Sequence, residues 1–150
     1  LSTMGPLKII DNLPENFLVM NGDILTDLNY QEFFDNHVNR KELFTISSYV
    51  RNQKVDYGVL ELNEDEYLSA FTEKPINKYQ VSMGIYMLNK RVLDFIPMLK
   101  FGFDSLMLKL IDLGEKVKVE KFEGYWLDIG RPDDYMKAIE DFESMKKFFI

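Results

Sequence analysis

Short apolar runs along this chain predict β-strands. Continuous or alternating apolar residues favour strands over residues 17–20, 44–50, 57–62, 67–72, 81–88, 116–122 and 125–129. The run at 17–20 is apolar throughout, which is typical of a strand buried on both faces. The runs at 57–62 and 67–72 flank the acidic stretch 63–66 and together predict a β-hairpin.

Apolar residues at helical spacing lie between these strands. They predict helices over residues 28–39, 91–96, 103–113 and 133–148. Asp27 is expected to cap the first helix, Gly114 to end the third, and Pro132 to begin the last. Since strands and helices alternate and no repeat or linker is found, we expect residues 1–150 to form a single α/β domain.

Composition narrows the class of protein. The 150 residues include 18 basic and 25 acidic side chains, a net charge of −7 that disfavours nucleic-acid binding. The chain has no cysteine, which excludes disulfides and zinc–thiolate sites. The apolar runs are too short to cross a membrane, so we expect a soluble cytoplasmic protein.

Two aspartates follow predicted strands at glycine turns. Asp23 comes after the strand at 17–20, and Asp128 lies just before Gly130. Ligands of open α/β sheets bind beyond the carboxyl ends of the strands, where two carboxylates can share a divalent cation. The alternative is that each aspartate only caps a turn.

Other residues have a chemical and a structural interpretation. Glu73 and Lys74 precede a proline at a strand end and are either ligand contacts or a surface ion pair. Gly58 and Gly84 lie within strands and indicate a bulge or a close approach of a ligand. The only histidine, His37, lies in a polar stretch and is expected at the surface, whereas Trp126 is expected to pack against apolar neighbours.

The order of several short motifs resembles the sugar-1-phosphate nucleotidylyltransferases. The motifs are Asn21-Gly22-Asp23, Tyr57-Gly58-Val59, Glu73-Lys74-Pro75, Gly84-Ile85-Tyr86, and the run from Trp126 to Gly130 followed by Asp133-Asp134-Tyr135. The resemblance covers essentially the whole chain. It implies a Rossmann-like three-layer α/β domain with a mostly parallel mixed sheet and the hairpin as an insertion.

The resemblance also implies a role for each motif. Asp23 and Asp128 would be catalytic and hold Mg²⁺, and Lys74 would contact the phosphate of the sugar. Glu73, Gly58 and Gly84 would bind the sugar. Gly5, in a segment similar to the family's L-G-T-A-G-x-L, would lie beside the nucleotide base, although Ser2 and Met4 depart from that pattern.

The family's glycine-rich signature for the triphosphate is missing from this sequence. We therefore expect the later part of a catalytic domain, without its first βα units and inactive alone. The expected substrates are a nucleoside triphosphate and a sugar 1-phosphate, and the motifs favour the mannose or heptose 1-phosphate guanylyltransferases. The alternative is a non-catalytic subunit that binds nucleotide sugars. We also expect an apolar sheet edge that favours self-association into a homo-oligomer.

Overall fold

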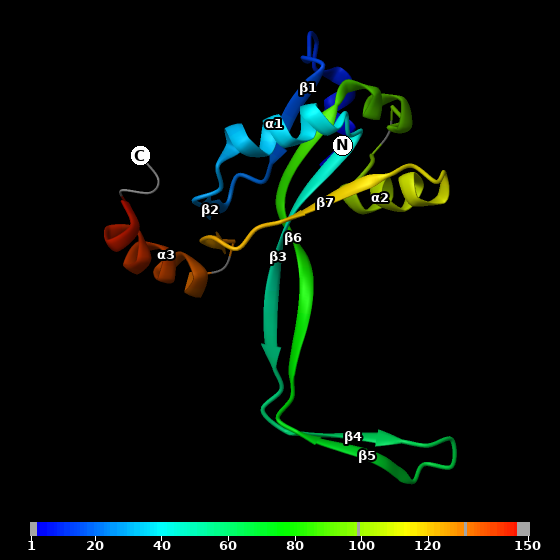
Figure 1. Cartoon of the computed structure of the whole chain (residues 1–150), viewed down its shortest axis with the longest axis vertical. Coiled ribbons are helices and arrows are strands. Elements are labelled where there is room, and N and C mark those ends of the chain that lie inside the picture. The colour runs from blue at the N-terminus through cyan, green and yellow to red at the C-terminus, as the bar shows by residue number, and fades with distance from the viewer. Residues whose placement is uncertain (1–2, 99, 131, 147–150) are drawn as a thin grey trace.

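A mixed β-sheet forms the centre of the molecule in a computed structural model that describes residues 3–98, 100–130 and 132–146 (Figure 1). The sheet has the order β1-β6-β3-β7. Its strands are β1 (Asn16–Met20), β3 (Phe44–Lys54), β6 (Ile76–Asn89) and β7 (Val117–Lys121).

Three of the four strands run in one direction. β6 pairs antiparallel with both β1 and β3, whereas β3 pairs parallel with β7. The expected mixed sheet is therefore confirmed, with β6 as the strand that runs against the others. β1 is an edge strand with Leu18 and Met20 exposed, so the expectation that residues 17–20 are buried on both faces was wrong. An apolar sheet edge was correctly expected.

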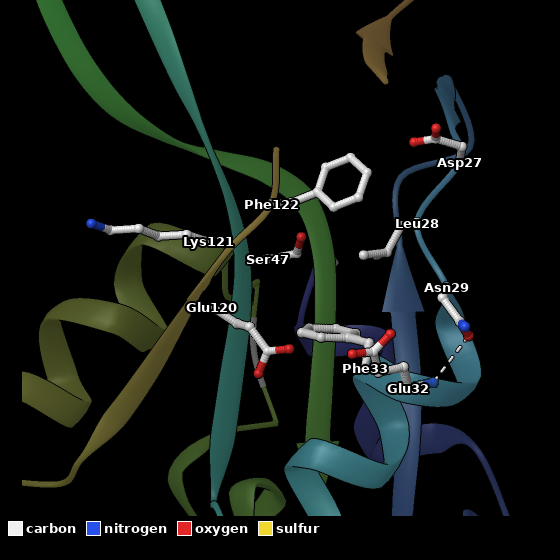
Figure 2. Close-up of a pocket in the computed structure, with 9 residues that line it drawn as sticks. All are labelled: Asp27, Leu28, Asn29, Glu32, Phe33, Ser47, Glu120, Lys121 and Phe122. Atoms are coloured by element: carbon white, nitrogen blue, oxygen red, sulfur yellow. Dashed lines mark hydrogen bonds between the residues drawn. The ribbon is translucent and has the colours of Figure 1, made fainter. Parts of the chain in front are cut away.

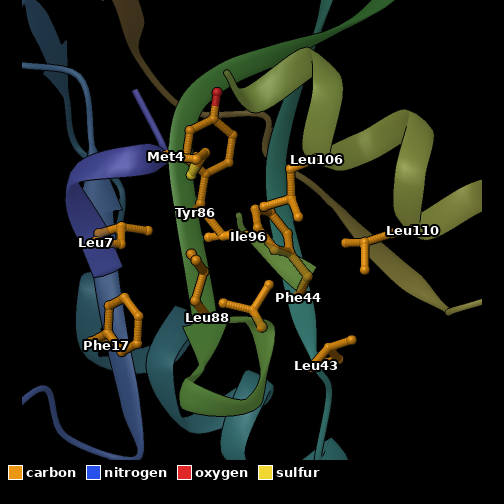
Figure 3. Close-up of a cluster of buried hydrophobic side chains, with 11 residues drawn as sticks. Met4, Leu7, Phe17, Leu43, Phe44, Tyr86, Leu88, Ile96, Leu106 and Leu110 are labelled. Atoms are coloured by element: carbon orange, nitrogen blue, oxygen red, sulfur yellow. The ribbon is translucent and has the colours of Figure 1, made fainter. Parts of the chain in front are cut away.

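Helices cover both faces of the sheet and give the expected three layers. On one face, η1 (Gly5–Ile9), η2 (Lys90–Phe95) and α2 (Phe103–Asp112) pack on side chains of β6 and β3. Figure 3 shows this core, in which Met4 and Leu106 pack around Tyr86, Leu88 and Phe44. On the other face, Phe33 of α1 (Tyr30–Arg40) packs on Ile85 and Met87. Since neighbouring residues of β6 point to opposite faces, this strand is buried on both.

The start and the inner face of α1 differ from the sequence predictions. Asn29 caps the helix, because its side-chain oxygen accepts a hydrogen bond from the backbone N–H of Glu32. Asp27 instead accepts a hydrogen bond from the backbone N–H of Tyr125 at 2.7 Å. His37 is buried, not exposed, and its Nδ1 lies 2.8 Å from Thr45 Oγ1.

The two central strands extend beyond the sheet as a two-stranded ribbon (Figure 1). Residues 48–54 of β3 pair with residues 76–82 of β6, which is longer than the strands predicted at 44–50 and 81–88. The hairpin of β4 (Gly58–Leu62) and β5 (Leu68–Glu73) stands at the far end of this ribbon. The sequence predicted this hairpin and its acidic turn correctly.

A separate pair of short strands joins the turn after β1 to the last helix. β2 (Ile24–Thr26) pairs antiparallel with β8 (Trp126–Asp128), and α3 (Pro132–Met145) follows. Tyr125 donates a hydrogen bond to Asp141 of α3. Burial, together with this contact to a carboxylate, raises the pKa of Tyr125 to about 12. Residues 147 and 148 of the predicted last helix lie outside the described residues. No described helix is long and apolar enough to cross a membrane.

Candidate active site

The pairing of β2 with β8 brings Asp23 and Asp128 together. Asp128 is the register partner of Ile24, the residue that follows Asp23. The backbone N–H of Ile129 donates a hydrogen bond to the carbonyl oxygen of Asp23 at 2.9 Å. Two residues 105 positions apart are thus fixed as neighbours by backbone contacts: Asp23 immediately precedes β2, and Asp128 is the last residue of β8.

The two carboxylates approach one point beside Gly130. A Cβ atom placed on Gly130 would lie 3.1 Å from Asp128 Oδ1 and 3.2 Å from Asp23 Oδ2. The Gly130 N–H also donates a hydrogen bond to Asp128 Oδ1 at 3.0 Å. The absence of a side chain at Gly130 therefore leaves open the space that both carboxylates face.

This donor set suits a hard divalent cation. Both side chains are exposed, both supply only oxygen atoms, and Mg²⁺ is commonly bound by one or two carboxylates together with water and substrate phosphates. No group of three or more His, Cys, Asp or Glu residues that could hold a metal occurs among the described residues. Asp23 and Asp128 therefore fit a cation that shares its coordination with a ligand, and not a closed structural metal site.

Asp128 lines a cavity of about 330 Å³. Its walls come from the turn after β1, the ribbon, α2 and β8: Asn21, Arg51, Val81, Ser82, Met83, Gly84, Tyr86, Phe103, Trp126 and Asp128. Asp128 is the only acidic residue of this lining and Arg51 the only basic one. A ligand in this cavity would meet amide, hydroxyl and aromatic groups, together with the negative charge of Asp128 and the positive charge of Arg51.

Gly84 shapes the floor of this cavity through a bulge in β6. The register between β3 and β6 shifts between Ile46 and Ser48, and Gly84 there adopts a φ of +74°. A Cβ on Gly84 would lie 2.7 Å from Asn21 Nδ2, while the Gly84 carbonyl accepts a hydrogen bond from the Asn21 N–H. Of the two interpretations of Gly84, the bulge is thus observed, and it places the glycine in the cavity wall.

Trp126 forms a second wall and is held on three sides. Its Nε1–H donates a hydrogen bond to the Met83 carbonyl at 3.1 Å, and its ring lies 5.4 Å from that of Tyr49. The guanidinium carbon of Arg51 stands 5.7 Å from the centre of the indole ring, a cation–π arrangement. The expected packing role of Trp126 is confirmed, and the same ring faces the cavity.

The hairpin residues stand apart from this cavity. Gly58 pairs with Glu73 at the base of the hairpin, and Lys74 lies 3.8 Å from the Glu73 carboxylate as an exposed ion pair. The ribbon between the hairpin and the bulge has seven residue pairs, and its ends are roughly 20 Å apart at the rise of a β-strand. A Cβ on Gly58 would overlap the ring of Phe71, which explains the glycine through packing within the hairpin.

Gly5 is also outside the cavity lining. It is buried in η1, and its backbone N–H donates a hydrogen bond to the Phe101 carbonyl at 3.0 Å. Met4, one of the departures from the family pattern, packs in the core with Leu106. Ser2, the other departure, lies outside the described residues.

A second cavity, of about 240 Å³, lies between the start of α1 and the end of β7 (Figure 2). Two of its three acidic residues have structural partners: Asp27 accepts a hydrogen bond from the Tyr125 N–H, and Glu120 binds Asn36 and Arg40. The amine of Lys121 points away from the cavity in Figure 2. The Glu120 contacts hold α1 to β7, and the cavity beside Asp128 is the stronger candidate for chemistry.

Comparison with known proteins identifies the class. The sequence profile of the family described as "Nucleotidyl transferase" matches residues 5–145, and the chain belongs to this family. The chain is similar to mannose-1-phosphate guanyltransferase of Candida albicans, with 28% identity over 92% of the chain and 40% of the relative. It is also similar to a probable mannose-1-phosphate guanylyltransferase of Oryza sativa subsp. japonica, with 29% identity over 98% of the chain and 43% of the relative.

Solved structures agree with the fold. HddC from Yersinia pseudotuberculosis superposes with a TM-score of 0.62 and 29% identity, over 95% of this chain and 63% of that one. The same protein complexed with GMP-PN gives a TM-score of 0.60 and 28% identity. The chain spans about 40% of the length of the curated relatives that it matches.

Proposed function

We propose that the protein carrying this chain transfers a guanylyl group from GTP to a sugar 1-phosphate, with mannose 1-phosphate as the first candidate, and releases pyrophosphate. The observation that carries the proposal is the approach of Asp23 Oδ2 and Asp128 Oδ1 to one point beside the cavity. The names of the relatives and the GMP-PN complex of the structural neighbour support the choice of nucleotide and sugar.

In this proposal, Asp23 and Asp128 bind Mg²⁺ through one carboxylate each. When bound, the metal would offset the repulsion between the two anionic substrates. The chain itself fixes the two carboxylates through the β2–β8 pairing. A glycine at position 130 leaves the space between them open. Both aspartates are then held at the cavity before the substrates arrive, which lowers the cost of ordering them.

The proposed reaction needs no general base from the chain. The second pKa of a phosphate monoester is about 6, so the attacking phosphate is largely ionised at neutral pH. The only histidine is buried between α1 and β3, where its Nδ1 contacts Thr45. The residues of the candidate site therefore suit a reaction that is accelerated by placing charges around the phosphates, and not by removing a proton.

In this proposal, Glu73 of the hairpin still contacts the sugar, and Lys74 still contacts the phosphate of the sugar. In the structure, Glu73 and Lys74 stand at the end of the ribbon, so this proposal requires the hairpin to approach the cavity when the substrate binds. A Lys74→Ala variant is expected to raise the KM for the sugar phosphate more than it lowers kcat. Equal KM values in the variant and the parent would contradict this role.

The test of the function is pyrophosphate release, measured with the complete product of the gene in the presence of Mg²⁺. Four nucleoside triphosphates are paired with mannose, glucose and heptose 1-phosphates, and GTP with mannose 1-phosphate is expected to react fastest. A non-catalytic nucleotide-sugar-binding subunit would bind GDP-mannose but release no pyrophosphate from any pair. That result would replace the enzyme proposal with the binding alternative.

A further inference from the structure

Arg51 is the one basic side chain in the cavity lining, and its guanidinium stands over the ring of Trp126. It is exposed on the ribbon, opposite Tyr79 of β6. The four ion pairs found in the described residues use Arg40, Lys54, Lys74 and Lys137, so Arg51 has no carboxylate partner there.

The guanidinium lies on the same side of β8 as the Asp128 carboxylate. Trp126 and Asp128 are two residues apart on β8, and residues at this spacing share a face of a strand. Since the Arg51 guanidinium stands over the Trp126 ring, it approaches the cavity from the face that bears Asp128. Tyr49, two residues before Arg51, packs on the same indole and keeps this part of the ribbon against β8.

We propose that Arg51 binds the phosphate group of a substrate in this cavity, and that Trp126 positions the guanidinium for it. The inference rests on the proposed function for the identity of the substrates. A guanidinium recognises phosphate through two parallel hydrogen bonds, and stacking on an aromatic ring leaves its N–H groups free at the edge to make them. The phosphate would then lie between the Arg51 guanidinium and the divalent cation that Asp23 and Asp128 would hold, with positive charge on both sides.

The phosphate belongs either to the sugar 1-phosphate or to the nucleotide, and binding measurements separate the two. Isothermal titration calorimetry with the chain and Mg²⁺ uses mannose 1-phosphate, GMP and uncharged mannose as separate ligands. Arg51→Gln is expected to weaken binding of one phosphate ligand by roughly tenfold, because a charge-assisted hydrogen-bond pair is lost. Arg51→Lys should restore part of the affinity, because it keeps the charge but not the planar fork.

The matched control is Lys78→Gln. Lys78 is adjacent to Tyr79 on β6 and pairs with Asn52, so it lies on the ribbon beside Arg51 but faces the opposite side. This variant removes the same charge and should bind each ligand within about twofold of the parent, since only distant charges screened by salt are altered. Trp126 is the only tryptophan of the chain, so a change of its fluorescence on binding places the ligand in this cavity.

Loss of affinity for mannose 1-phosphate alone would assign Arg51 to the sugar phosphate, and loss for GMP alone would assign it to the nucleotide. The proposal is overturned if the parent binds neither ligand, if Arg51→Gln binds both as tightly as the parent, or if Lys78→Gln loses as much affinity. A failure of the proposed function looks different: phosphate binding would still depend on Arg51, but no substrate pair would release pyrophosphate.

Discussion

Asp23 and Asp128 face one another across the space beside Gly130, with an oxygen of each carboxylate 3.1–3.2 Å from the position of a Cβ on that glycine. The β2–β8 pairing sets this relationship, because Ile24 is the register partner of Asp128. The proposed binding of a metal ion by these two carboxylates therefore depends on the backbone pairing of two short strands.

Gly130→Ala tests this space directly. The added methyl group would stand closer to both carboxylate oxygens than side-chain carbons normally do, so the oxygens must move apart. We expect the affinity for Mg²⁺, measured by calorimetry, to fall by about tenfold while the fold is kept, since a small shift of a preorganised ligand is enough to weaken binding. Gly22→Ala is the control, because nothing lies within 4 Å of its Cβ position. Equal Mg²⁺ affinities in the two variants would contradict the geometry.

Gly84→Ala should destabilise the fold. Gly84 has a φ of +74°, and its Cβ would lie 2.7 Å from Asn21 Nδ2 and 3.0 Å from Ile24 Cδ1. Unfavourable backbone conformation and crowding together predict a loss of about 1–3 kcal/mol in the free energy of unfolding, measured in urea. An unchanged free energy of unfolding would mean that the bulge does not require glycine.

His37 should make stability depend on pH. Burial lowers the pKa of His37 below its usual 6.5, and its Nε2 is buried without a hydrogen-bond partner. Below pH 6.5 the unfolded chain binds a proton more readily than the folded one, so the free energy of unfolding falls as the pH decreases. We expect the free energy of unfolding to decrease measurably between about pH 7 and pH 5.

His37→Gln isolates this effect, because His37 is the only histidine in the chain. The variant keeps a polar group near Thr45 but does not titrate, so its stability should be nearly flat over the same range of pH. An equal slope in the variant and the parent would assign the pH dependence to other groups.

The apolar edge of the sheet should cause self-association. Among the described residues, β6 is the one strand that pairs with β1, and Leu18 and Met20 are 38% and 40% exposed. Light scattering should detect oligomers of the chain at increasing concentration, and Leu18→Lys should shift their formation to higher concentration, because a charge on an edge strand disfavours pairing. A parent chain that stays monomeric throughout would refute this prediction.

The fold could be predicted where the local pattern of apolar and polar residues matched the structure. The hairpin followed from its acidic turn between two apolar runs, and α2 from its apolar stripe. The ribbon did not, because residues 51–54 and 76–80 are mostly polar and exposed on both faces. His37 was misplaced because its sequence neighbours are polar, whereas on the helix it lies one turn after the buried Phe33 and faces the sheet.

The candidate site was predicted only in part for a similar reason. Asp23 and Asp128 were selected as candidates because each lies beside a predicted strand end and a glycine turn. The strand at 125–129 was predicted, but β2 covers only three residues, and no local pattern indicated that it would pair with β8. Arg51 and Asn21 were missed. The strand predicted at 44–50 ended before Arg51, and nothing in the sequence indicated that Trp126 would lie against Tyr49 and Arg51.

The most direct test of the account is Mg²⁺-dependent pyrophosphate release by the complete gene product with Asp128→Asn, compared with the parent and with Asp65→Asn at the hairpin turn. Removing one of two charged metal ligands should lower kcat by about a hundredfold or more, while Asp65→Asn should stay close to the parent. An Asp128→Asn enzyme that keeps the parental rate and the parental Mg²⁺ dependence would contradict the assignment of the Asp23–Asp128 pair as the metal site.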